Sequence, residues 1–408
     1  PLWVVDGIPV ISYDQNVMST VGAGSGTTMA SINPNDIESI TVLKDAAASS
    51  IYGSRAANGV ILVTTKSGKQ GKSSFTARAK MGATVLSNDN DLKPVSAAEL
   101  LDFQRVAIKN AGFDPDDPKG NYYRPMSLLD GPITNWYDHL TRVGNMQEYE
   151  VNALGGNEKA SFYTSLAYHK ETGVYYGVDF QRFTARVNAD YRLLDNLKVG
   201  AKVNAGFSDQ SSGQMGRLYY SNGAYAMWNI LPWTPAYDEN GGHNLDLPNN
   251  SNTNPRQVAE YDDYNDKSYR FQGSMYAEYK PIEQVSIKST NGAEMSYVNS
   301  RQYWSPEAND GTSTLWLTRS DSYRLTTSNT VTYNDTYADK HSLRVLAGQE
   351  AQVDNYSWLR GYSPDVDPAI PFPNTGNAAS DEVGYGESAE TLLSFFGLAD
   401  YSFDSKYY

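Results

Sequence analysis

Histidines are the first residues to consider for catalysis or metal binding, and this chain has four of them: His139, His169, His243 and His341. They lie far apart, and none belongs to a metal-ligand spacing such as two histidines on one helical face. The chain has no cysteine, so disulfides and thiolate metal sites are closed to it, and it has no G-x-S-x-G nucleophile elbow. The sequence therefore predicts no catalytic residue, no metal centre and no cofactor.

Two other patterns have chemical potential but a plainer explanation. The glycines Gly22, Gly24 and Gly26 in VGAGSGTTMAS suggest a phosphate loop, yet no apolar strand leads into them and no lysine follows the last glycine. Clustered carboxylates at 262–266 and 365–367 offer oxygens to a hard cation. With 47 acidic against 33 basic residues, however, acidic loops are expected to be solvated in most cases. The net charge of −14, without a basic stripe, argues against nucleic-acid binding.

Aromatic residues are the stronger candidates for ligand binding. The chain has 31 Tyr, 12 Phe and 7 Trp, which suits both sugar-binding surfaces and membrane-interface girdles. One polar segment, 209–267, holds eight of them, and we predict that six of these bind substrate by stacking: Tyr219, Tyr220, Tyr225, Trp228, Trp233 and Tyr237. The alternative is that these rings pack the segment's own core or a membrane girdle.

The elements that carry these residues are β-strands with a period of two. In 197–208 the odd positions, from Leu197 to Phe207, are apolar or small, whereas the even positions, from Lys198 to Ser208, are mostly polar. The preceding stretch, 182–193, alternates in the same way, and Leu194–Asn196 joins the two as a tight hairpin. We count about ten such strands, the first near 74–85 and the last near 392–403.

Connection lengths alternate along these strands. Tight turns at 155–159, 194–196, 281–284, 338–340 and 404–406 alternate with long polar segments at 88–145, 209–267, 305–313 and 358–390. Outer-membrane barrels have this asymmetry, with short periplasmic turns and long extracellular loops, although soluble β-sandwiches also alternate. No apolar run approaches 18 residues, which excludes a transmembrane helix and leaves a barrel open.

A different unit precedes the hairpins. Ile37, Ile40, Val42 and Leu43 predict a short strand, and Asp45 is placed to cap a helical turn that Gly53 can stop. Asn58 and Gly59 predict a tight turn, and Val60–Val63 is a continuous apolar run, typical of a strand that is buried on both faces.

This unit resembles the plug domain of TonB-dependent outer-membrane transporters. The matching blocks are VVDGIPV (4–10), INPNDIESITVLKDA (32–46) and IYGSRAANGVILVTTK (51–66), and they resemble the SusC/RagA-like branch of Bacteroidetes. Two later blocks, 155–174 and 392–408, resemble early barrel hairpins of that branch. The resemblance implies a transmembrane antiparallel β-barrel with a small α+β plug in its lumen.

The resemblance also implies how the chain is organised. We expect the C-terminal part of a plug at 1–67 and the N-terminal part of a barrel at 73–408, with extracellular loops at 88–145, 209–267 and 358–390. Ten strands enclose too little space for a folded plug, so we expect an internal piece of a longer protein with about 22 strands.

By the same resemblance, the whole protein imports an oligosaccharide or an oligopeptide across the outer membrane of a Gram-negative cell. Its expected partners are a SusD-like surface lipoprotein, the TonB–ExbB–ExbD energy system and membrane lipid. A siderophore or cobalamin receptor is the alternative within transport, and a non-transporting β-rich surface adhesin is the alternative outside it.

Two charged plug residues are predicted to hold and release the plug. Glu38 and Arg55 flank its strand and turn, and either can pair with the inner wall of the barrel, where we predict charged residues at Arg182, Arg186, Lys202 and Glu278. The alternative is that both are solvent-facing charges of the kind that contribute little.

Overall fold

The computed structural model describes residues 1–10, 32–44, 50–86, 94–212, 220–309, 311–338, 340–376 and 378–404. Several sequence predictions fall wholly or partly outside these residues: the glycine cluster at 22–26, the helix cap at Asp45, the candidate binding residue Tyr219 and parts of the turns at 338–340 and 404–406.

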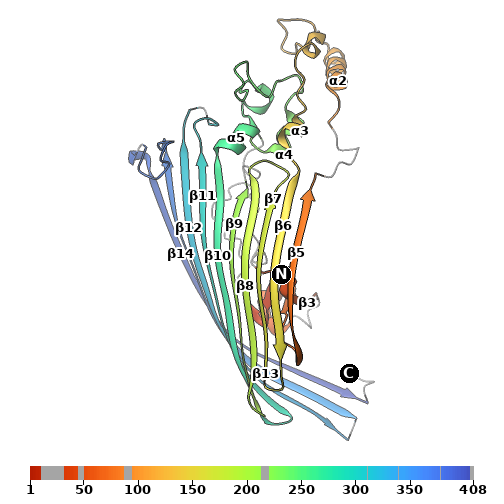
Figure 1. Cartoon of the computed structure of the whole chain (residues 1–408), viewed down its shortest axis with the longest axis vertical. Helices are drawn as coiled ribbons and strands as arrows, with labels where there is room; N and C mark the ends of the chain where they lie inside the picture. The colour runs from red at the N-terminus through yellow and green to blue at the C-terminus, as the bar shows by residue number, and fades with distance from the viewer. Residues whose placement is uncertain are drawn as a thin grey trace.

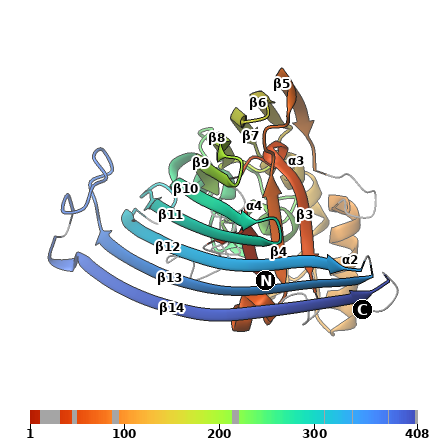
Figure 2. The same ribbon diagram turned by 90° about the horizontal axis from the view of Figure 1, so that it is seen from below.

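Most of the described chain forms one curved sheet of ten antiparallel strands in sequence order (Figure 1). The strands are β5 Gly71–Thr84, β6 Gly144–Gly156, β7 Ala160–Thr172, β8 Val178–Leu194, β9 Leu197–Ser212, β10 Asp263–Ile282, β11 Val285–Trp304, β12 Thr314–Tyr337, β13 His341–Pro364 and β14 Glu382–Phe403. Seen from below, the sheet bends into an open arc with a concave and a convex side (Figure 2).

The predicted alternation is visible in burial. On β8 the even-numbered Arg186 and Asn188 are buried on the concave side, whereas the odd-numbered Phe183, Val187 and Tyr191 are exposed. The register keeps these parities together, because Val187 pairs with Val203 of β9, and Val203 in turn pairs with Gly273 of β10. One face of the sheet is therefore polar and the other is apolar, as predicted from the sequence.

Two of the long connections are shorter than predicted because the strands beside them continue into polar sequence. The segment predicted at 209–267 is reduced to 213–262, and the one predicted at 358–390 is reduced to 365–381. The segment predicted at 88–145 runs over 85–143. Ladder hydrogen bonds continue through residues such as Asp209–Ser212, where apolar alternation, the signal used to place strand ends, has stopped.

The N-terminal unit is a separate four-stranded sheet in the order β2-β1-β4-β3. Its strands are β1 Leu2–Val5, β2 Ile8–Pro9, β3 Ile37–Leu43 and β4 Val60–Thr65, with β1 and β4 parallel. Asp6 and Gly7 both have positive φ, at 53° and 86°, and form the tight turn between β1 and β2. Two short 3-10 helices complete it, η2 Pro34–Asp36 and η3 Ser50–Ala56, and Gly53 interrupts η3 with a φ of 64°.

Strand β4 packs on both of its faces, as its apolar run predicted. Val60 and Leu62 join the cluster formed by Leu2, Val4 and Ala56. Ile61 and Val63 join a second cluster on the opposite face, formed by Val5, Val10 and Ile32. The small sheet therefore has two thin cores, and further cover comes from its docking on the large sheet.

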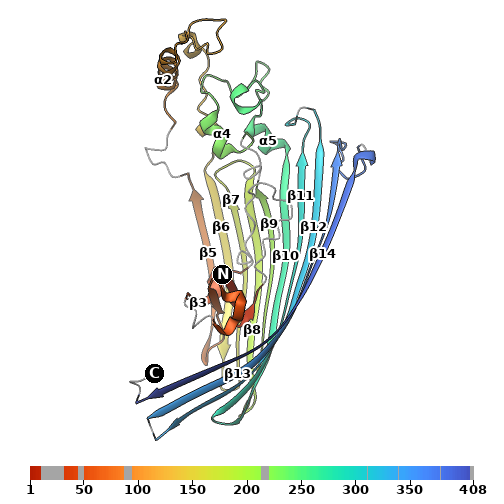
Figure 3. The ribbon, with the colours of Figure 1, turned by 180° about the vertical axis from the view of Figure 1, so that it is seen from behind.

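The small sheet lies on the concave side of the large one, near the middle of the strands (Figures 2 and 3). The helices gather at one end of the long strands (Figure 1): α2 Ala97–Asn110, α3 Trp136–Leu140, α4 Gly223–Asn229 and α5 Pro255–Tyr261, with the 3-10 turns η5 Met126–Leu129 and η6 Pro248–Asn250. The 3-10 turn η7, Ala378–Ser380, lies between β13 and β14. None of the described helices has the length and apolar character needed to cross a membrane.

Candidate functional site

Two buried carboxylates of the small sheet meet two basic side chains of the large sheet. Asp6 accepts from Lys202 Nζ at 2.8 Å and lies 3.7 Å from Arg186 Nη1. Asp36 lies 3.5 Å from Arg186 Nε. The Arg186 side chain is 2% exposed and those of Asp6 and Asp36 are 5% and 0% exposed, so the charges are desolvated and need one another.

Neutral hydrogen bonds complete this contact. The Tyr163 hydroxyl of β7 donates to Asp36 Oδ1 at 2.7 Å, and the Thr65 hydroxyl of β4 donates to Asp6 Oδ2 at 2.7 Å. Asn188 of β8 donates to Thr65 Oγ1 at 2.9 Å and to the Lys66 carbonyl at 2.7 Å. Asp6 is therefore held by hydrogen bonds from Lys202 and Thr65, whereas Asp36 has one described hydrogen bond, from Tyr163, and its Oδ2 is approached by Arg186 only as an ion pair at 3.5 Å.

Local structure explains how the carboxylates reach the wall. Asp6 lies in the turn after β1, whose positive φ angles turn the chain tightly back. Asp36 ends the short helix η2, and Asn33 caps that helix by accepting from the Asn35 N–H at 3.1 Å. Asp6 is thus positioned by a tight turn of the small sheet, and Asp36 by a capped short helix.

A second contact, of opposite polarity, lies farther along the large sheet. Arg55 of η3 donates to Glu350 Oε1 and to Gln352 Oε1 of β13, both at 2.6 Å. Gln352 donates in turn to Asp354, which forms a two-point ion pair with Arg324 at 2.6 and 2.8 Å. The Arg55 and Glu350 side chains are 24% and 12% exposed, so this contact is more accessible to solvent than the first. Burial, together with the Glu350 charge, raises the pKa of the neighbouring Tyr52 hydroxyl.

The sequence predicted other partners for the two plug charges. Arg55 pairs with Glu350 and not with Glu278, which instead accepts from Ser286 on the neighbouring strand. Glu38 lies 3.3 Å from Lys69, and both side chains are largely exposed, so this pair matches the alternative of a local charge. Arg186 and Lys202 do contact the small sheet, but through Asp6 and Asp36.

Sequence reasoning missed Asp6 and Asp36, although both lie inside the blocks that carry the plug resemblance. For Asp6 the available signal was an acidic residue that interrupts apolar sequence, whereas Asp36 lies in polar sequence and has no such signal. The wall partners of both carboxylates lie more than a hundred residues away in the chain.

The candidate aromatic residues lie at the loop end of the strands, where segments 85–143 and 213–262 pack together. Their shared core includes Trp136 and Leu140 of α3 and Met227 and Ile230 near α4. Trp228 is 48% exposed and, with Trp136, lines a hollow of about 760 Å³ between the two segments. Trp233 is half-buried, and Tyr220 and Tyr225 are exposed. Of the predicted residues, Trp228 has the clearest access to a ligand-sized space.

Tyr237 takes part in the packing of the loops. Its ring stacks with His243 at 5.7 Å and meets His139 edge-on at 5.4 Å. Burial lowers the pKa of His139, helped by the charge of Arg256 and by His243. The neutral imidazole is therefore the form that fits between the two loop segments.

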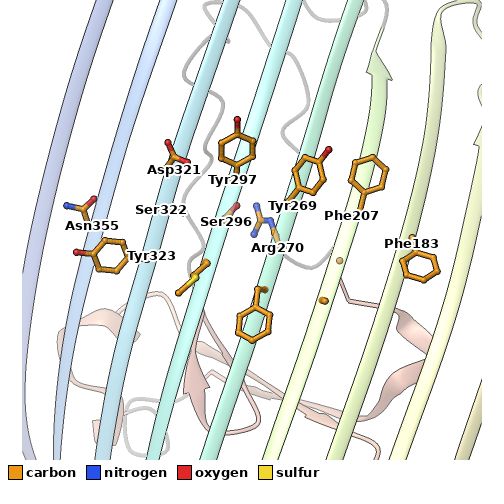
Figure 4. Close-up of a pocket in the computed structure, with 14 residues that line it drawn as sticks. Phe183, Phe207, Tyr269, Arg270, Ser296, Tyr297, Asp321, Ser322, Tyr323 and Asn355 are labelled. Carbon is orange, nitrogen blue, oxygen red and sulfur yellow. The ribbon is translucent and has the colours of Figure 1, made fainter.

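The convex side of the large sheet has an aromatic row of its own. Phe183, Phe207, Tyr269 and Tyr297 are successive register partners on β8–β11 and line a shallow hollow of about 590 Å³ (Figure 4). They belong to the parity that points away from the small sheet. An aromatic row on the outward-facing parity is consistent with a membrane-facing surface.

Comparison with known proteins matches this architecture. Residues 1–60 match the family model described as the TonB-dependent receptor plug domain. TonB-dependent receptor P26 of Formosa agariphila is 29% identical over the whole chain, and SusC of Bacteroides thetaiotaomicron is 31% identical over 69% of it. The chain belongs to the TonB-dependent receptors. Its relatives are consistent with the SusC/RagA-like type, and it spans 40% of the length of P26 and 28% of that of SusC.

Solved structures support the same fold. The RagAB peptide importer in its open-open state superposes with a TM-score of 0.80 at 23% identity, over 99% of this chain and 46% of that one. The ferric citrate transporter FecA superposes with a TM-score of 0.59 at 9% identity, over 98% of this chain. The predicted fold class is confirmed: the ten strands are barrel wall, and the small sheet is a plug on its inner side. Members of this family are β-barrels of the outer membrane.

Proposed function

We propose that the whole protein imports an oligomeric nutrient across the outer membrane and that the plug is its gate. The observation that carries this proposal is the docking of the plug through charges of opposite sign at two places on the wall. Such a plug is held firmly enough to close a pore, and its contacts are non-covalent, so it can be displaced. A barrel that closed its pore with its own wall would need no such contacts.

Displacement of the plug requires a source of energy. Family membership supports TonB, driven by ExbB and ExbD, as that source. We further propose a surface lipoprotein of the SusD type as a partner at the loop end, where α2 to α5 extend beyond the strands (Figure 3).

Substrate capture is assigned to the loop end and to the concave wall. Trp228, with Tyr220, Tyr225 and Trp233 nearby, offers aromatic surface around the hollow between the loop segments. Glu38 and Arg55 were predicted to gate the plug; we retain Arg55 for this role, since it contacts the wall, and assign Glu38 none.

Deletion of residues 1–67 from the complete protein tests the gate. The barrel should still insert, because its strand ladder satisfies its own backbone hydrogen bonds. Passive entry of a large antibiotic should rise, and energised uptake of a labelled natural oligomer should fall. Uptake by the intact protein that is the same with and without a working TonB would identify a passive porin and overturn the proposal.

The same cells separate the alternatives. A siderophore or cobalamin receptor would restore uptake of radiolabelled iron chelate or vitamin in a strain that lacks its own receptors. An adhesin would show no uptake of any solute but would retain cells on a surface.

A further inference from the structure

One line of register partners crosses the wall from β7 to β13 on its concave side. Each residue of this line is the direct partner of the next one on the neighbouring strand. We call the line the seating row, and its members are Tyr163, Asn188, Lys202, Ser274, Gly292, Thr326 and Gln352. The plug contacts the wall along this row.

Four members of the seating row form hydrogen bonds with the plug. Their partners on the plug come from separate turns and strands of the small sheet. The pairs are Tyr163–Asp36, Asn188–Thr65, Lys202–Asp6 and Gln352–Arg55. The buried contact and the Arg55 contact therefore meet the wall at the two ends of one row.

The middle of the seating row consists of small residues. Ser274 of β10, Gly292 of β11 and Thr326 of β12 are successive register partners. Longer side chains border them, Lys202 on one side and Gln352 on the other. The wall therefore leaves the most room for the plug at Gly292, which has no side chain.

Ile8 of β2 fills this room. A Cβ at Gly292 would lie only 3.0 Å from each of the Cγ1, Cγ2 and Cδ1 atoms of Ile8. The Ile8 side chain is 3% exposed, yet it is not among the described residues of either apolar cluster of the plug. Because Ile8 is branched at Cβ, one change of rotamer does not move all three atoms away. Any larger residue at position 292 would have to displace Ile8.

Ile8 is coupled to the buried charges by the turn in which it lies. It pairs with Val5 across that turn, and the positive φ angles of Asp6 and Gly7 define the turn between them. A displacement of Ile8 is therefore passed to Asp6, whose carboxylate lies 2.8 Å from Lys202 Nζ. Donor–acceptor distances of protein hydrogen bonds span only about half an ångström, so a small displacement weakens this bond.

We propose that Ile8 and Gly292 form the positioning contact of the closed gate. The apolar side chain of the plug lies on bare backbone of the wall and holds the contacts at both ends of the seating row in register. This inference rests on the proposed function of the plug as a gate. The contact adds what the charges lack, because an ion pair attracts over a range of distances whereas close packing accepts one arrangement.

Leak through the purified full-length receptor in a planar lipid bilayer, without TonB, tests this role. Gly292→Ala should raise the leak roughly tenfold, which corresponds to about 1.4 kcal/mol of lost closure. Gly361→Ala of β13 is the matched control, because a Cβ there would meet nothing within 4 Å and its parity is opposite to that of Gln352. Any gain from replacing a strand glycine is common to both variants. The receptor without residues 1–67 gives the leak of the open pore.

A compensating change in the plug separates positioning from a defect of the wall. Ile8→Ala removes the three atoms that a Cβ at Gly292 would meet. The double variant Gly292→Ala with Ile8→Ala should therefore leak less than Gly292→Ala alone, since changes at contacting residues are not additive. Ile8→Ala alone leaves the wall unchanged and should also raise the leak, because the side chain that seats the plug is lost.

A Gly292→Ala receptor as tight as Gly361→Ala would overturn the inference, and so would a double variant that leaks as much as Gly292→Ala. If Gly292→Ala does not fold, Ile8→Ala decides the question: a leak above that of the wild type supports the positioning contact, and a tight receptor refutes it. Failure of the proposed function looks different. A receptor without residues 1–67 that leaks no more than the wild type would show that the plug is not the gate.

Discussion

The Tyr163 hydroxyl of the barrel wall donates a hydrogen bond of 2.7 Å to Asp36 of the plug, and both side chains are completely buried. A tyrosine on the wall and a carboxylate on the plug are thus joined in a place that water does not reach. Arg186 approaches the other oxygen of the same carboxylate at 3.5 Å. The plug is therefore fixed by a buried polar contact whose partners cannot be exchanged for water unless the two domains separate.

Asp36→Asn should loosen the plug strongly. The change leaves Arg186 buried with one remaining carboxylate, Asp6, and breaking a buried pair by removing one partner typically costs roughly 3–5 kcal/mol. The measurement is the urea concentration at which a protease begins to cut the plug inside the folded barrel. Glu38→Gln is the control, because its exposed pair with Lys69 should contribute at most about 1 kcal/mol. Equal shifts for the two variants would contradict this account of the contact.

Glu350→Gln should raise passive leakage with a smaller loss of stability. The pair with Arg55 is partly exposed, so we expect a loss of about 1 kcal/mol once solvent screening is considered. Sensitivity to a large antibiotic reports the leakage. The double variant Arg55→Ala with Glu350→Gln should leak no more than the more harmful single variant, since both changes remove the same Arg55–Glu350 contact. Fully additive effects would show that the two residues act separately.

Val203→Lys should destabilise the barrel by roughly 2–4 kcal/mol if Val203 lies near the bilayer midplane. Gln272→Lys is the matched control, since Gln272 immediately precedes Gly273, the register partner of Val203, and faces the lumen. Asn204 is a poor control because it is buried against the plug side, at 3% exposure. Urea titration of the refolded barrel measures both variants, and identical losses would refute the assignment of faces.

Acidification should loosen the packing of the two loop segments. Burial lowers the pKa of His139 in the packed state, so the separated state binds more protons between that pKa and the ordinary value near 6.5. Packing should be strongest above about pH 6.5 and should weaken as the pH falls through that value and down to the lowered pKa. Fluorescence of the neighbouring Trp136 reports it, and His139→Phe should remove most of the pH dependence. A variant as pH-sensitive as wild type would assign the effect to another group.

The hairpins were predictable because their signal is local. Alternation along 182–193 and 197–207 assigns each residue to a face, and a one-residue error would reverse every side chain at once. At the loop end, β9, β13 and β14 extend farther than the sequence predicted. Strand pairing can continue beyond an apolar band without apolar residues, so alternation gives no signal there. The loop packing of Tyr237 with His139 was also beyond reach, because it depends on two segments that are distant in sequence.

The site was predictable only as a class of contact. Charges on the plug were expected to meet charges on the wall, and Arg186 and Lys202 were among the wall residues named. Which plug residue reaches which wall residue depends on how the plug is oriented in the lumen, and no local pattern encodes that orientation. Glu350 is one of many acidic residues in the chain, and only the position of Arg55 distinguishes it.

The two plug contacts have opposite polarity: the wall is basic at β8 and β9 and acidic at β13. A plug turned so that Asp6 and Asp36 faced Glu350, or so that Arg55 faced Arg186, would bring like charges together, and that contact would become a repulsion. The charge pattern therefore favours one orientation of the plug against the wall. Plugs exchanged between paralogous receptors should seat only where donor and host share this polarity, which limits the recombination of receptor genes at the plug boundary.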